Sequence, residues 1–452
     1  MLSAAPYLYA SLLVAGYTVF TLWCYRASLQ RRWLRNQHGT VPLVVAYASE
    51  SGAAETLAQQ LSQQLVAQGL SCQCLTLNQL TDKTLSTTQK LLVLASTYGQ
   101  GEAPDNGRHF IARLTHSAVT LNHLAYAVLA LGDRDYPQFC QFGLNLDAAL
   151  TERGATALFA PVLVDKLASD SLHTWYQALQ QAQILAAEPA ALKPKAYLGA
   201  EFTLARRQWL NVGSQGAPLY DIAFSLPPDV TWQAGDIACL HLDHKMREYS
   251  IASVPAEGEL RLLVREQRHP DGRLGLGSGW LCVRSPVGAT SLLSIRRNVK
   301  FHAPATNRKM ILIGNGSGLA GLRAHIKQRA LQGHYDNWLI YGERSPEHDL
   351  PWDDELQTWL KTGVLAELDR AFSRAALPLP VLAGRVQQGY VQDVLRSHSE
   401  QLLLWLEEGA AVYICGSLQG MAGDVEALFT ELLGERGLSA LEAQGRYCRD
   451  VY

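Results

Sequence analysis

The sequence has little that would suit nucleic-acid binding, disulfide bonding or a structural metal site. Its 39 basic and 41 acidic side chains leave a net charge of -2, and no long basic run with interleaved aromatics occurs. We therefore expect no nucleic-acid partner. The eight cysteines are scattered and form no C-x-x-C pair, and Cys72 and Cys74 are too close together to make a zinc knuckle alone. Reduced thiols and no metal are expected.

Acidic side chains are absent from residues 1–40, and residues 1–25 contain no charged side chain. The run from Ala4 to Tyr25 is long enough to span a hydrocarbon core, which needs roughly 20 apolar residues. Arg26, Arg31, Arg32 and Arg35 follow this run, as expected for a helix whose carboxyl end stays in the cytoplasm. We predict that residues 1–40 form a membrane anchor and a basic juxtamembrane segment. A cleaved signal peptide is the alternative, but a basic n-region is missing.

Three short apolar runs in the next segment each end in a loop of small and polar residues. Apolar runs of this length, alternating with helical patterns, predict a doubly wound α/β domain over residues 41–188. Open sheets of this type bind ligands at the carboxyl ends of their strands. The three loops are S-E-S-G-A-A-E (Ser49–Glu55), S-T-Y-G-Q-G-E (Ser96–Glu102) and G-D-R-D-Y-P-Q-F-C (Gly132–Cys140).

This segment resembles the flavodoxin-like FMN domain of diflavin reductases. The resemblance implies a phosphate loop at the first motif and two ring-stacking loops at the second and third, with Tyr98 and Tyr136 enclosing the flavin. Ala53 departs from the family, which often has a hydroxyl there. The implied FMN contacts are Ser49, Glu50, Ser51, Gly52, Ala53, Ala54, Ser96, Thr97, Tyr98, Gly99, Leu131, Gly132, Asp133, Tyr136, Phe139, Cys140 and Asp165.

A proline-containing linker near residues 188–195 precedes a β-rich stretch with the string R-E-Y-S-I-A-S, Arg247 to Ser253. An arginine can bind a phosphate through two parallel hydrogen bonds, and a tyrosine offers a flat face. The string resembles the FAD motif of the ferredoxin–NADP reductase family, so an FAD-binding antiparallel β-barrel is expected over residues 189–305. The implied FAD contacts are Arg247, Glu248, Tyr249, Ser250, Gly275, Leu276, Gly277, Ser278 and the C-terminal Tyr452.

The run K-M-I-L-I, Lys309 to Ile313, leads into G-N-G-S-G-L-A-G-L-R, Gly314 to Arg323. A glycine-rich loop between a strand and a helix suits a pyrophosphate. The loop resembles the NADP element of the same family, which implies an α/β NADP-binding domain over residues 306–452. Gly321 replaces the family's proline, so a looser helix start is expected. Gln388 replaces a lysine, and Arg385 is a hypothetical substitute. The implied NADPH contacts are Gly314, Ser317, Gly318, Ser373, Arg374, Gln388, Tyr390, Gln392 and Asp424.

Four residues are implied by the resemblance to surround the reacting atoms. Ser250 would lie near flavin N5 and Cys415 beside the nicotinamide, Asp450 would be the catalytic acid, and Tyr452 would cover the flavin. Hydride transfer needs such a close, dry arrangement.

The resemblance therefore predicts an NADPH-dependent diflavin oxidoreductase with FMN, FAD and NADPH as cofactors. Its acceptor would be a haem protein or a membrane reductase system, with the flavin domains on the cytoplasmic side of a bacterial inner membrane. Larger relatives carry a connecting domain between the G-D strand and the R-x-Y-S motif, and only ten residues separate Asp236 from Arg247 here. A sulfite reductase flavoprotein component and a non-enzymatic flavin-binding scaffold or sensor are the alternatives.

Overall fold

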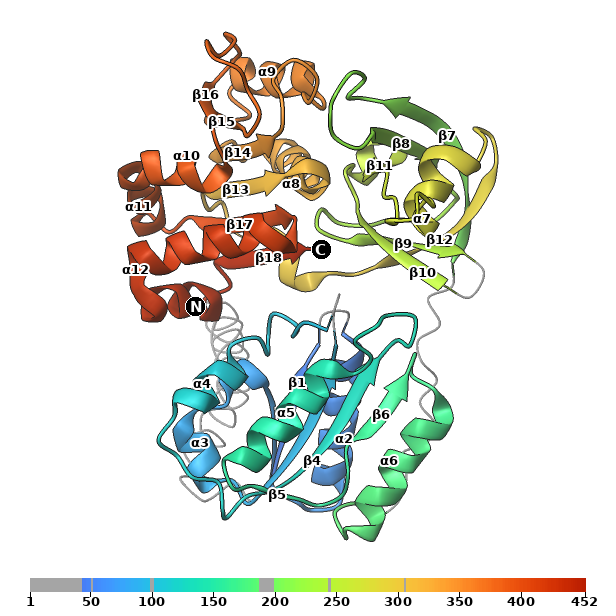
Figure 1. Ribbon diagram of the computed structural model, residues 1–452, viewed down its shortest axis with the longest axis vertical. Helices are drawn as coiled ribbons and strands as arrows, with labels where there is room; N and C mark the ends of the chain where they lie inside the picture. Colours follow the sequence, from blue (N-terminus) through green and yellow to red (C-terminus); the bar gives the residue numbers. More distant parts are fainter. Residues whose placement is uncertain (1–42, 50–51, 98–100, 187–198, 243–244, 305) are drawn as a thin grey trace, which may run out of the picture. The chain divides into compact units, whose positions relative to one another are not determined.

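The computed structural model describes residues 43–49, 52–97, 101–186, 199–242, 245–304 and 306–452. The chain divides into two compact units, residues 1–192 and 193–452, which are called unit 1 and unit 2 below (Figure 1). The finer division of the second unit at residues 305 and 306 stays a prediction.

Unit 1 is built on a parallel sheet in the order β2-β1-β3-β4, and β5 and β6 both pair with β4 (Figure 1). Its strands are β1 (Leu43–Ala48), β2 (Cys72–Thr76), β3 (Lys90–Ser96), β4 (Ala125–Gly132), β5 (Thr156–Ala157) and β6 (Val162–Asp165). Its helices are α2 (Ala53–Ala67), α3 (Asp82–Thr87), α4 (Phe110–His116), α5 (Gln141–Glu152) and α6 (Ser169–Gln181).

The sheet of unit 1 is covered on both faces because its strands are apolar on both sides. In β1, Val44 packs into a core with residues of α4 and α5, whereas its neighbour Val45 packs into a second core with α2 and α6. Strand residues alternate between the two faces of a sheet, so a strand that is apolar throughout must be covered on both faces. Because β1, β3 and β4 pair in parallel, their carboxyl ends lie side by side at one edge of the sheet.

Unit 2 begins with an antiparallel sheet in the order β10-β9-β12-β7-β8-β11. A bridge between Ile251, directly after β10, and Leu262 of β11 joins its two outer strands, so the sheet closes into a barrel. The core of the barrel contains Phe202, Phe224, Leu240 and Leu293. The strands are β7 (Ala200–Trp209), β8 (Leu219–Ser225), β9 (Ile237–Leu242), β10 (Lys245–Ser250), β11 (Glu259–Arg265) and β12 (Thr290–Arg296), and the short helix α7 is Leu276–Gly279.

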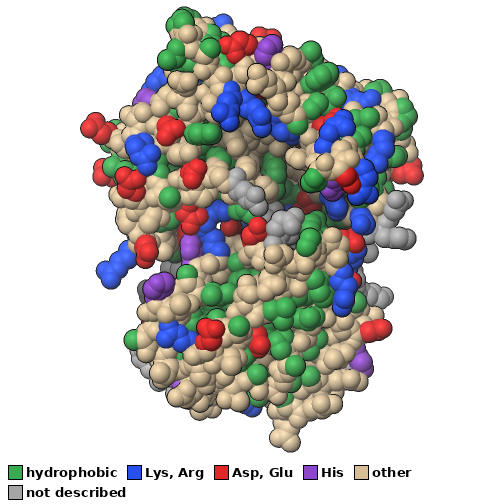
Figure 2. Space-filling model, in the orientation of Figure 1, with side chains coloured by type: hydrophobic (Ala, Val, Ile, Leu, Met, Phe, Trp, Pro, Cys, Tyr) green, Lys and Arg blue, Asp and Glu red, His purple; other side chains and the backbone are tan. Residues whose placement is uncertain are grey.

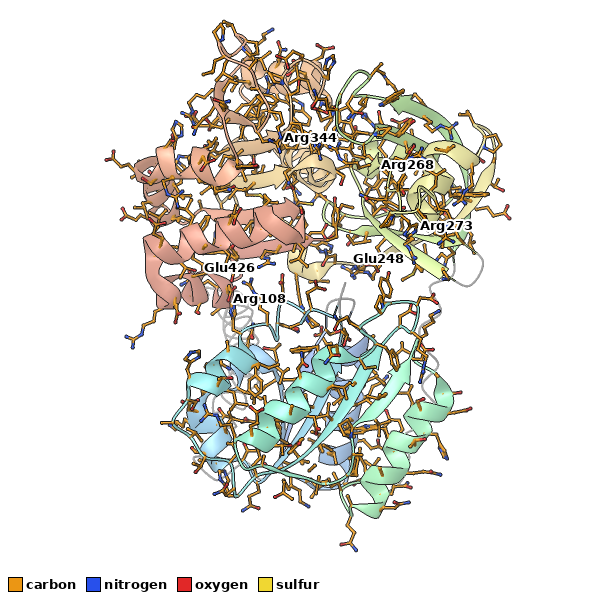
Figure 3. The ribbon with its side chains drawn as sticks, viewed as in Figure 1. Arg108, Glu248, Arg268, Arg273, Arg344 and Glu426 are labelled. Carbon is orange, nitrogen blue, oxygen red and sulfur yellow. The ribbon has the colours of Figure 1, made fainter. Side chains whose placement is uncertain are left out.

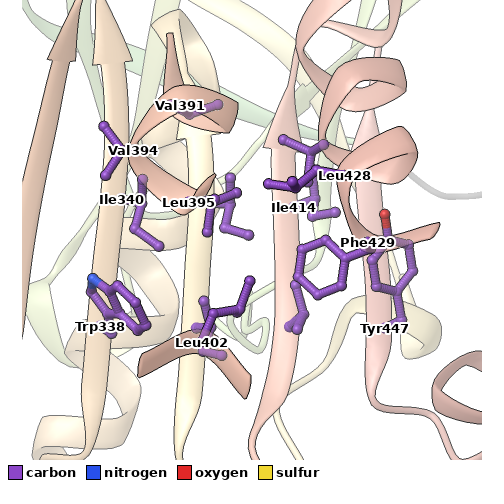
Figure 4. Close-up of a cluster of buried hydrophobic side chains, with 14 of the residues drawn as sticks. Trp338, Ile340, Val391, Val394, Leu395, Leu402, Ile414, Leu428, Phe429 and Tyr447 are labelled. Carbon is purple, nitrogen blue, oxygen red and sulfur yellow. The ribbon is translucent and has the colours of Figure 1, made fainter. Parts of the chain in front are cut away.

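The rest of unit 2 is a parallel sheet in the order β16-β15-β14-β13-β17-β18. One face packs against α10, α11 and α12, as Figure 4 shows for Trp338, Val394, Leu402 and Phe429. The strands are β13 (Met310–Asn315), β14 (Asn337–Glu343), β15 (Glu367–Phe372), β16 (Arg385–Gln388), β17 (Ala411–Gly416) and β18 (Tyr447–Val451). The helices are α8 (Leu319–Leu331), α9 (Asp353–Thr362), α10 (Val391–Ser397), α11 (Ser399–Glu407) and α12 (Gly423–Ala443).

The barrel packs against the other face of this parallel sheet, where α8 and α9 lie. Phe301 and Leu263 from the barrel side share a core cluster with Leu322 of α8. The buried Arg323 of α8 strengthens this junction, since it donates to the carbonyl of Ala252 at 2.7 Å and pairs with Glu257 at 2.7 Å and Glu355 at 2.6 Å. Buried charges need such partners, so the two sheets are held together by both apolar and ionic contacts.

The predicted transmembrane helix over residues 4–25 lies outside the described residues, and within those that are described no helix is long and apolar enough to cross a membrane. Helix α2 has 15 residues and is too short to span the core. Helix α12 has 21 residues but carries Asp424, Glu431 and Glu435, whose charges are costly in hydrocarbon. We therefore correct the predicted fold class and the predicted membrane localisation. The described fold is α/β, with a parallel sheet in unit 1, a barrel and a second parallel sheet in unit 2, and no membrane-spanning helix among the described residues.

Candidate cofactor and hydride-transfer sites

The first predicted phosphate loop follows β1. Ser49 is buried there, and its N–H donates to Asn106 Oδ1 at 2.8 Å. Gly52 has a φ of 84°, which glycine adopts without strain, and it precedes the first residues of α2, Ala53 and Ala54. Glu50 and Ser51 lie outside the described residues. Asn106 was not found by sequence reasoning, because it belongs to no motif and reaches the loop only through the fold.

The second and third loops of unit 1 meet at the ends of β3 and β4. Ser96 ends β3, and the N–H of Thr97 donates to the carbonyl of Leu131 at 2.8 Å. Thr97 Oγ1 in turn accepts the N–H of Phe142 at 3.3 Å. Tyr98 and Gly99 lie outside the described residues, so one of the two predicted ring-stacking tyrosines, Tyr136, is described.

Gly132 is the closest-packed position of the third loop. A Cβ there would meet the backbone nitrogen of Cys140 at 2.8 Å and its Sγ at 2.9 Å. Cys140 is buried in a left-handed conformation, and its thiol donates to the carbonyl of Ala130 at 3.2 Å. Burial raises the pKa of this thiol to about 11, so Cys140 shapes the loop as a neutral side chain.

Acidic side chains organise the rim of the same loop. Asp165 Oδ1 accepts the N–H of Arg134 at 3.0 Å, and Asp133 Oδ1 accepts the N–H of Asp135 at 2.8 Å. Lys166 pairs with Asp135 at 3.0 Å. Phe139 is half-buried and lies under the guanidinium of Arg134, 4.6 Å from its ring centre. Asp133, Tyr136, Phe139 and Asp165 therefore lie at one edge of the sheet, and their contacts with FMN stay a prediction.

In unit 2 the R-E-Y-S string forms β10, and it meets the short helix α7. A Cβ added at Gly277 would lie 2.4 Å from Tyr249 Oη and 2.9 Å from Arg247 Cγ. Glycine is therefore needed for the approach of these two side chains. Gly275 precedes α7 and Leu276 begins it, and Ser278 Oγ accepts the N–H of Gln267 at 3.1 Å. An arginine, an aromatic ring and a glycine-rich helix start converge here, which fits a dinucleotide with a flat ring.

Glu248 alternates to the opposite face of β10. It forms two parallel hydrogen bonds with Arg296 of β12, at 2.7 Å and 2.9 Å (Figure 3 labels Glu248). The side chain of Glu248 is thus engaged by Arg296, and its role as an FAD contact stays a prediction.

The glycine-rich loop after β13 packs against the end of β17. A Cβ at Gly318 would lie 2.0 Å from the carbonyl oxygen of Cys415, and one at Gly314 would lie 2.7 Å from it. Helix α8 begins at Leu319, and Gly321 lies in its first turn, so the expected looser helix start stays a prediction. A Cβ at Gly321 would be 3.2 Å from Cys415 Sγ, so the missing side chain leaves room for the thiol.

The predicted 2′-phosphate residues lie at the carboxyl ends of β14 and β15. The N–H of Ser373 donates to the carbonyl of Glu343 at 3.0 Å, and that of Arg374 to the carbonyl of Arg344 at 2.7 Å. The side chains of Arg344 and Arg374 are both exposed. Figure 2 shows Lys and Arg side chains gathered over the region where Figure 3 labels Arg344. Sequence reasoning missed Arg344, although its place directly after a buried strand was a usable signal.

Gln388, which stands at the position of the family's lysine, and Arg385, its hypothetical substitute, both have partners within the protein. Arg385 pairs with Asp369 at 2.6 Å and with Glu367 at 3.1 Å, and its role as a substitute stays a hypothesis. Gln388 donates to the carbonyl of Ala375 at 3.1 Å. Tyr390 is exposed beside them.

Gln392 and Asp424 are brought together although 32 positions separate them, and their side chains are 3.0 Å apart.

Ser250, Cys415 and Asp450 form one group, called the Asp450 cluster. The Ser250 hydroxyl donates to Asp450 Oδ2 at 2.6 Å, and the Cys415 thiol donates to the same oxygen at 3.7 Å. Cys415 and Asp450 are register partners on β17 and β18, whereas Ser250 ends β10 of the barrel. Burial raises the pKa of Asp450 and of Cys415, so Cys415 stays a thiol.

Tyr452 follows the cluster at the end of the chain. Its N–H donates to the carbonyl of Gly416 and its hydroxyl donates to Ser317 Oγ at 3.1 Å, while 49% of its side chain stays exposed. The backbone of this terminal residue thus continues the sheet, and its ring lies against the glycine-rich loop.

Comparisons with known proteins support a flavodoxin domain and an oxidoreductase NAD-binding domain. Residues 45–175 match the flavodoxin family model, and residues 312–427 match the oxidoreductase NAD-binding domain model. Proteins named sulfite reductase [NADPH] flavoprotein alpha-component are similar to this chain. The one from Mannheimia succiniciproducens is 27% identical over 91% of this chain and 90% of its own length, and the one from Vibrio vulnificus is 26% identical over 91% and 87%.

Proposed function

The chain is a member of the diflavin reductase family with FMN, FAD and NADPH as cofactors, and from this premise we propose that it delivers electrons from NADPH to a haem protein. The observation that carries the proposal is the Asp450 cluster. It joins the strand of the FAD motif, β10, to the two strands that end at the nucleotide loop, β17 and β18.

Each residue of the cluster has a distinct task in this proposal. When bound, NADPH supplies a hydride and the two flavins carry its electrons onward. Asp450 Oδ2 accepts from both Ser250 and Cys415, so it fixes the directions of their O–H and S–H bonds. The Ser250 oxygen is thereby held in place at the reacting face, and the buried neutral Cys415 excludes water there.

Arg247, Tyr249 and Gly277 bind FAD in this proposal. The glycine allows the aliphatic stem of Arg247 and the hydroxyl of Tyr249 to approach the start of α7, where the pyrophosphate would be held. Tyr452 would cover the other side of the flavin, since its ring lies against the glycine-rich loop and its hydroxyl donates to Ser317 Oγ at 3.1 Å.

Selectivity for NADPH over NADH rests on Arg374 and Arg344. Both guanidinium groups are exposed at adjacent strand ends, where a phosphate can be bound through parallel hydrogen bonds. Gln388 and Arg385 are already engaged by Ala375 and by Asp369, so they add no free charge.

A second candidate acceptor is the haem component of a sulfite reductase. The printed names of the similar proteins favour it, and this chain covers about nine-tenths of their length. However, β9 and β10 are joined by two residues, and the alignments run over 545 to 549 positions, more than the 452 residues of this chain. The relatives therefore contain segments that this chain lacks, and its acceptor can differ from theirs.

The test uses the whole chain. We expect one FMN and one FAD for each chain, with NADPH-driven reduction of cytochrome c that far exceeds the NADH-driven rate. Reduction of a sulfite reductase haemoprotein at a similar rate would favour the second candidate. Absence of either flavin, or a failure to oxidise NADPH, would refute the proposed function.

A further inference from the structure

The two faces of β10 have different partners. Arg247 and Tyr249 meet Gly277, whereas Glu248 and Ser250 project to the opposite face, because strand residues alternate. The strand register pairs Ser250 with Ile237 of β9, and Ile237 with Arg296 of β12. Arg296 therefore lies in the same row of the sheet as Ser250, on the face that carries the Asp450 cluster.

Arg296 is a buried cation with one direct carboxylate partner in the described chain. Its side chain is 8% exposed, and Glu248 binds it through both carboxylate oxygens at 2.7 Å and 2.9 Å. Glu248 itself is 30% exposed and reaches water. A guanidinium keeps its proton, so this site always carries a positive charge that Glu248 balances.

The charges of Arg296 and Glu248 both affect the pKa of the Asp450 carboxyl. Arg296 lowers and Glu248 raises the pKa of the Asp450 carboxyl, while burial raises it and the bond from Ser250 lowers it. Cys415 and Tyr452 also face Asp450, and burial raises the pKa of both, so both are neutral.

Other charged side chains near β18 have ion-pair partners of their own or lie at the surface. Arg449 points to α12 and pairs with Glu426 at 2.6 Å. His302 binds Asp236 at 2.5 Å, and Lys300 lies on an exposed turn. Arg296 is buried in the same row of the barrel sheet as Ser250, which bonds to Asp450, and its charge lowers the pKa of that carboxyl.

We propose that the Glu248–Arg296 pair regulates the charge of the Asp450 cluster. Arg296 keeps Asp450 in the anionic state, in which Oδ2 accepts from both Ser250 and Cys415. Glu248 limits this effect, because it neutralises most of the charge that Arg296 presents. Arg296 and Glu248 are positioning residues that act through Asp450, and this inference rests on the proposed hydride-transfer function only for its catalytic consequence.

The experiment measures the protonation of Asp450 in the oxidised, flavin-loaded protein without NADPH. Infrared difference spectra across a pH series report the carbonyl stretch of the protonated carboxyl, and Asp450→Asn identifies the band. Glu248→Gln is expected to move its midpoint down by roughly one pH unit, and Arg296→Gln to move it up by about as much. The double variant is expected to return close to the unsubstituted protein, because the two charges are removed together.

Two further variants separate charge from structural damage. Arg296→Lys keeps the charge and is expected to leave the midpoint near its original value. Glu259→Gln breaks another ion pair of the barrel, with Arg206 at 3.1 Å, and no shift is expected because Glu259 is not among the groups acting on Asp450.

Shifts of both single variants in the same direction, or a double variant as displaced as either single one, would overturn the proposal. If the pH profile of flavin reduction by NADPH follows the infrared midpoints, the catalytic consequence holds. If the protein fails to oxidise NADPH at all, the proposed function is lost, but the infrared midpoints still decide the charge regulation.

Discussion

The hydroxyl of Ser250 donates to Asp450 Oδ2 at 2.6 Å although 200 positions separate the two residues. Ser250 belongs to the barrel and Asp450 to the parallel sheet, so this bond crosses the junction that Arg323 and the Phe301 cluster hold together. A bond of this kind ties the flavin side of the site to the nucleotide side. Its loss should therefore affect the reaction more than the binding of either cofactor.

Replacing Asp450 by Asn should slow flavin reduction by NADPH by about 10²-fold, because the side chain loses the charge that orients Ser250 and Cys415. The flavin content should not change, since Asp450 is outside the predicted FAD contacts. Stopped-flow absorbance of the flavin measures the rate. The double variant with Ser250→Ala should be little slower than the slower single variant, because the two residues act as a unit. If the rate loss of the double variant equalled the product of the two single losses, the residues would not act as a unit.

Substitution of Arg374 by Ala should lower the preference for NADPH over NADH by roughly tenfold to a hundredfold, the value of one charge-assisted hydrogen bond to a phosphate. The comparison of kcat/KM for both nucleotides checks it. Arg344→Ala should act in the same direction, because its exposed guanidinium lies at the neighbouring strand end. Arg385→Ala is the control and should leave the preference unchanged. An unaltered preference in Arg374→Ala would show that the 2′-phosphate binds elsewhere.

Substitution of two glycines should affect the binding of FAD and of FMN separately. Gly277→Ala places a methyl group 2.4 Å from Tyr249 Oη, so the FAD content should fall while FMN is retained. Gly132→Ala places one 2.8 Å from the nitrogen of Cys140, so FMN should be lost instead. Flavin release followed by chromatography measures both. Gly423→Ala is the control, because nothing lies within 4 Å of the added Cβ. Loss of both flavins in either variant would indicate general misfolding.

Acid should destabilise unit 2 through His325. This histidine is fully buried between Phe301 and Tyr413, and burial lowers its pKa from 6.5 to about 3. Below pH 6.5 the unfolded chain takes up a proton that the folded chain refuses, so stability falls as the pH drops from 6.5 toward 3. At pH 5 the loss is about 2 kcal/mol.

Chemical denaturation of His325→Leu across this pH range should show a smaller fall in the free energy of unfolding, because the contribution of His325 is removed. The exposed His116→Gln provides the control and should keep the slope. A His325→Leu protein with the original pH dependence would mean that other groups cause the acid loss.

The sequence by itself determined the strand-loop-helix motifs and, through their resemblance, the cofactors. Strand and loop positions follow from local burial patterns and from backbone needs such as the glycines at 132, 277 and 318, which are local properties of the chain. The apolar run at residues 4–25 has the same local character, but an apolar run alone does not show that a helix spans a membrane.

Only the tertiary structure decided how side chains from distant segments pair. The Asp450 cluster depends on the register of β17 with β18 and on the junction with the barrel. The same holds for the choice of partners by Arg385, which binds Asp369, and by Glu248, which binds Arg296 instead of projecting with Arg247 and Tyr249. These contacts are set by strand order and side-chain direction, and neither is encoded in any one segment of the sequence.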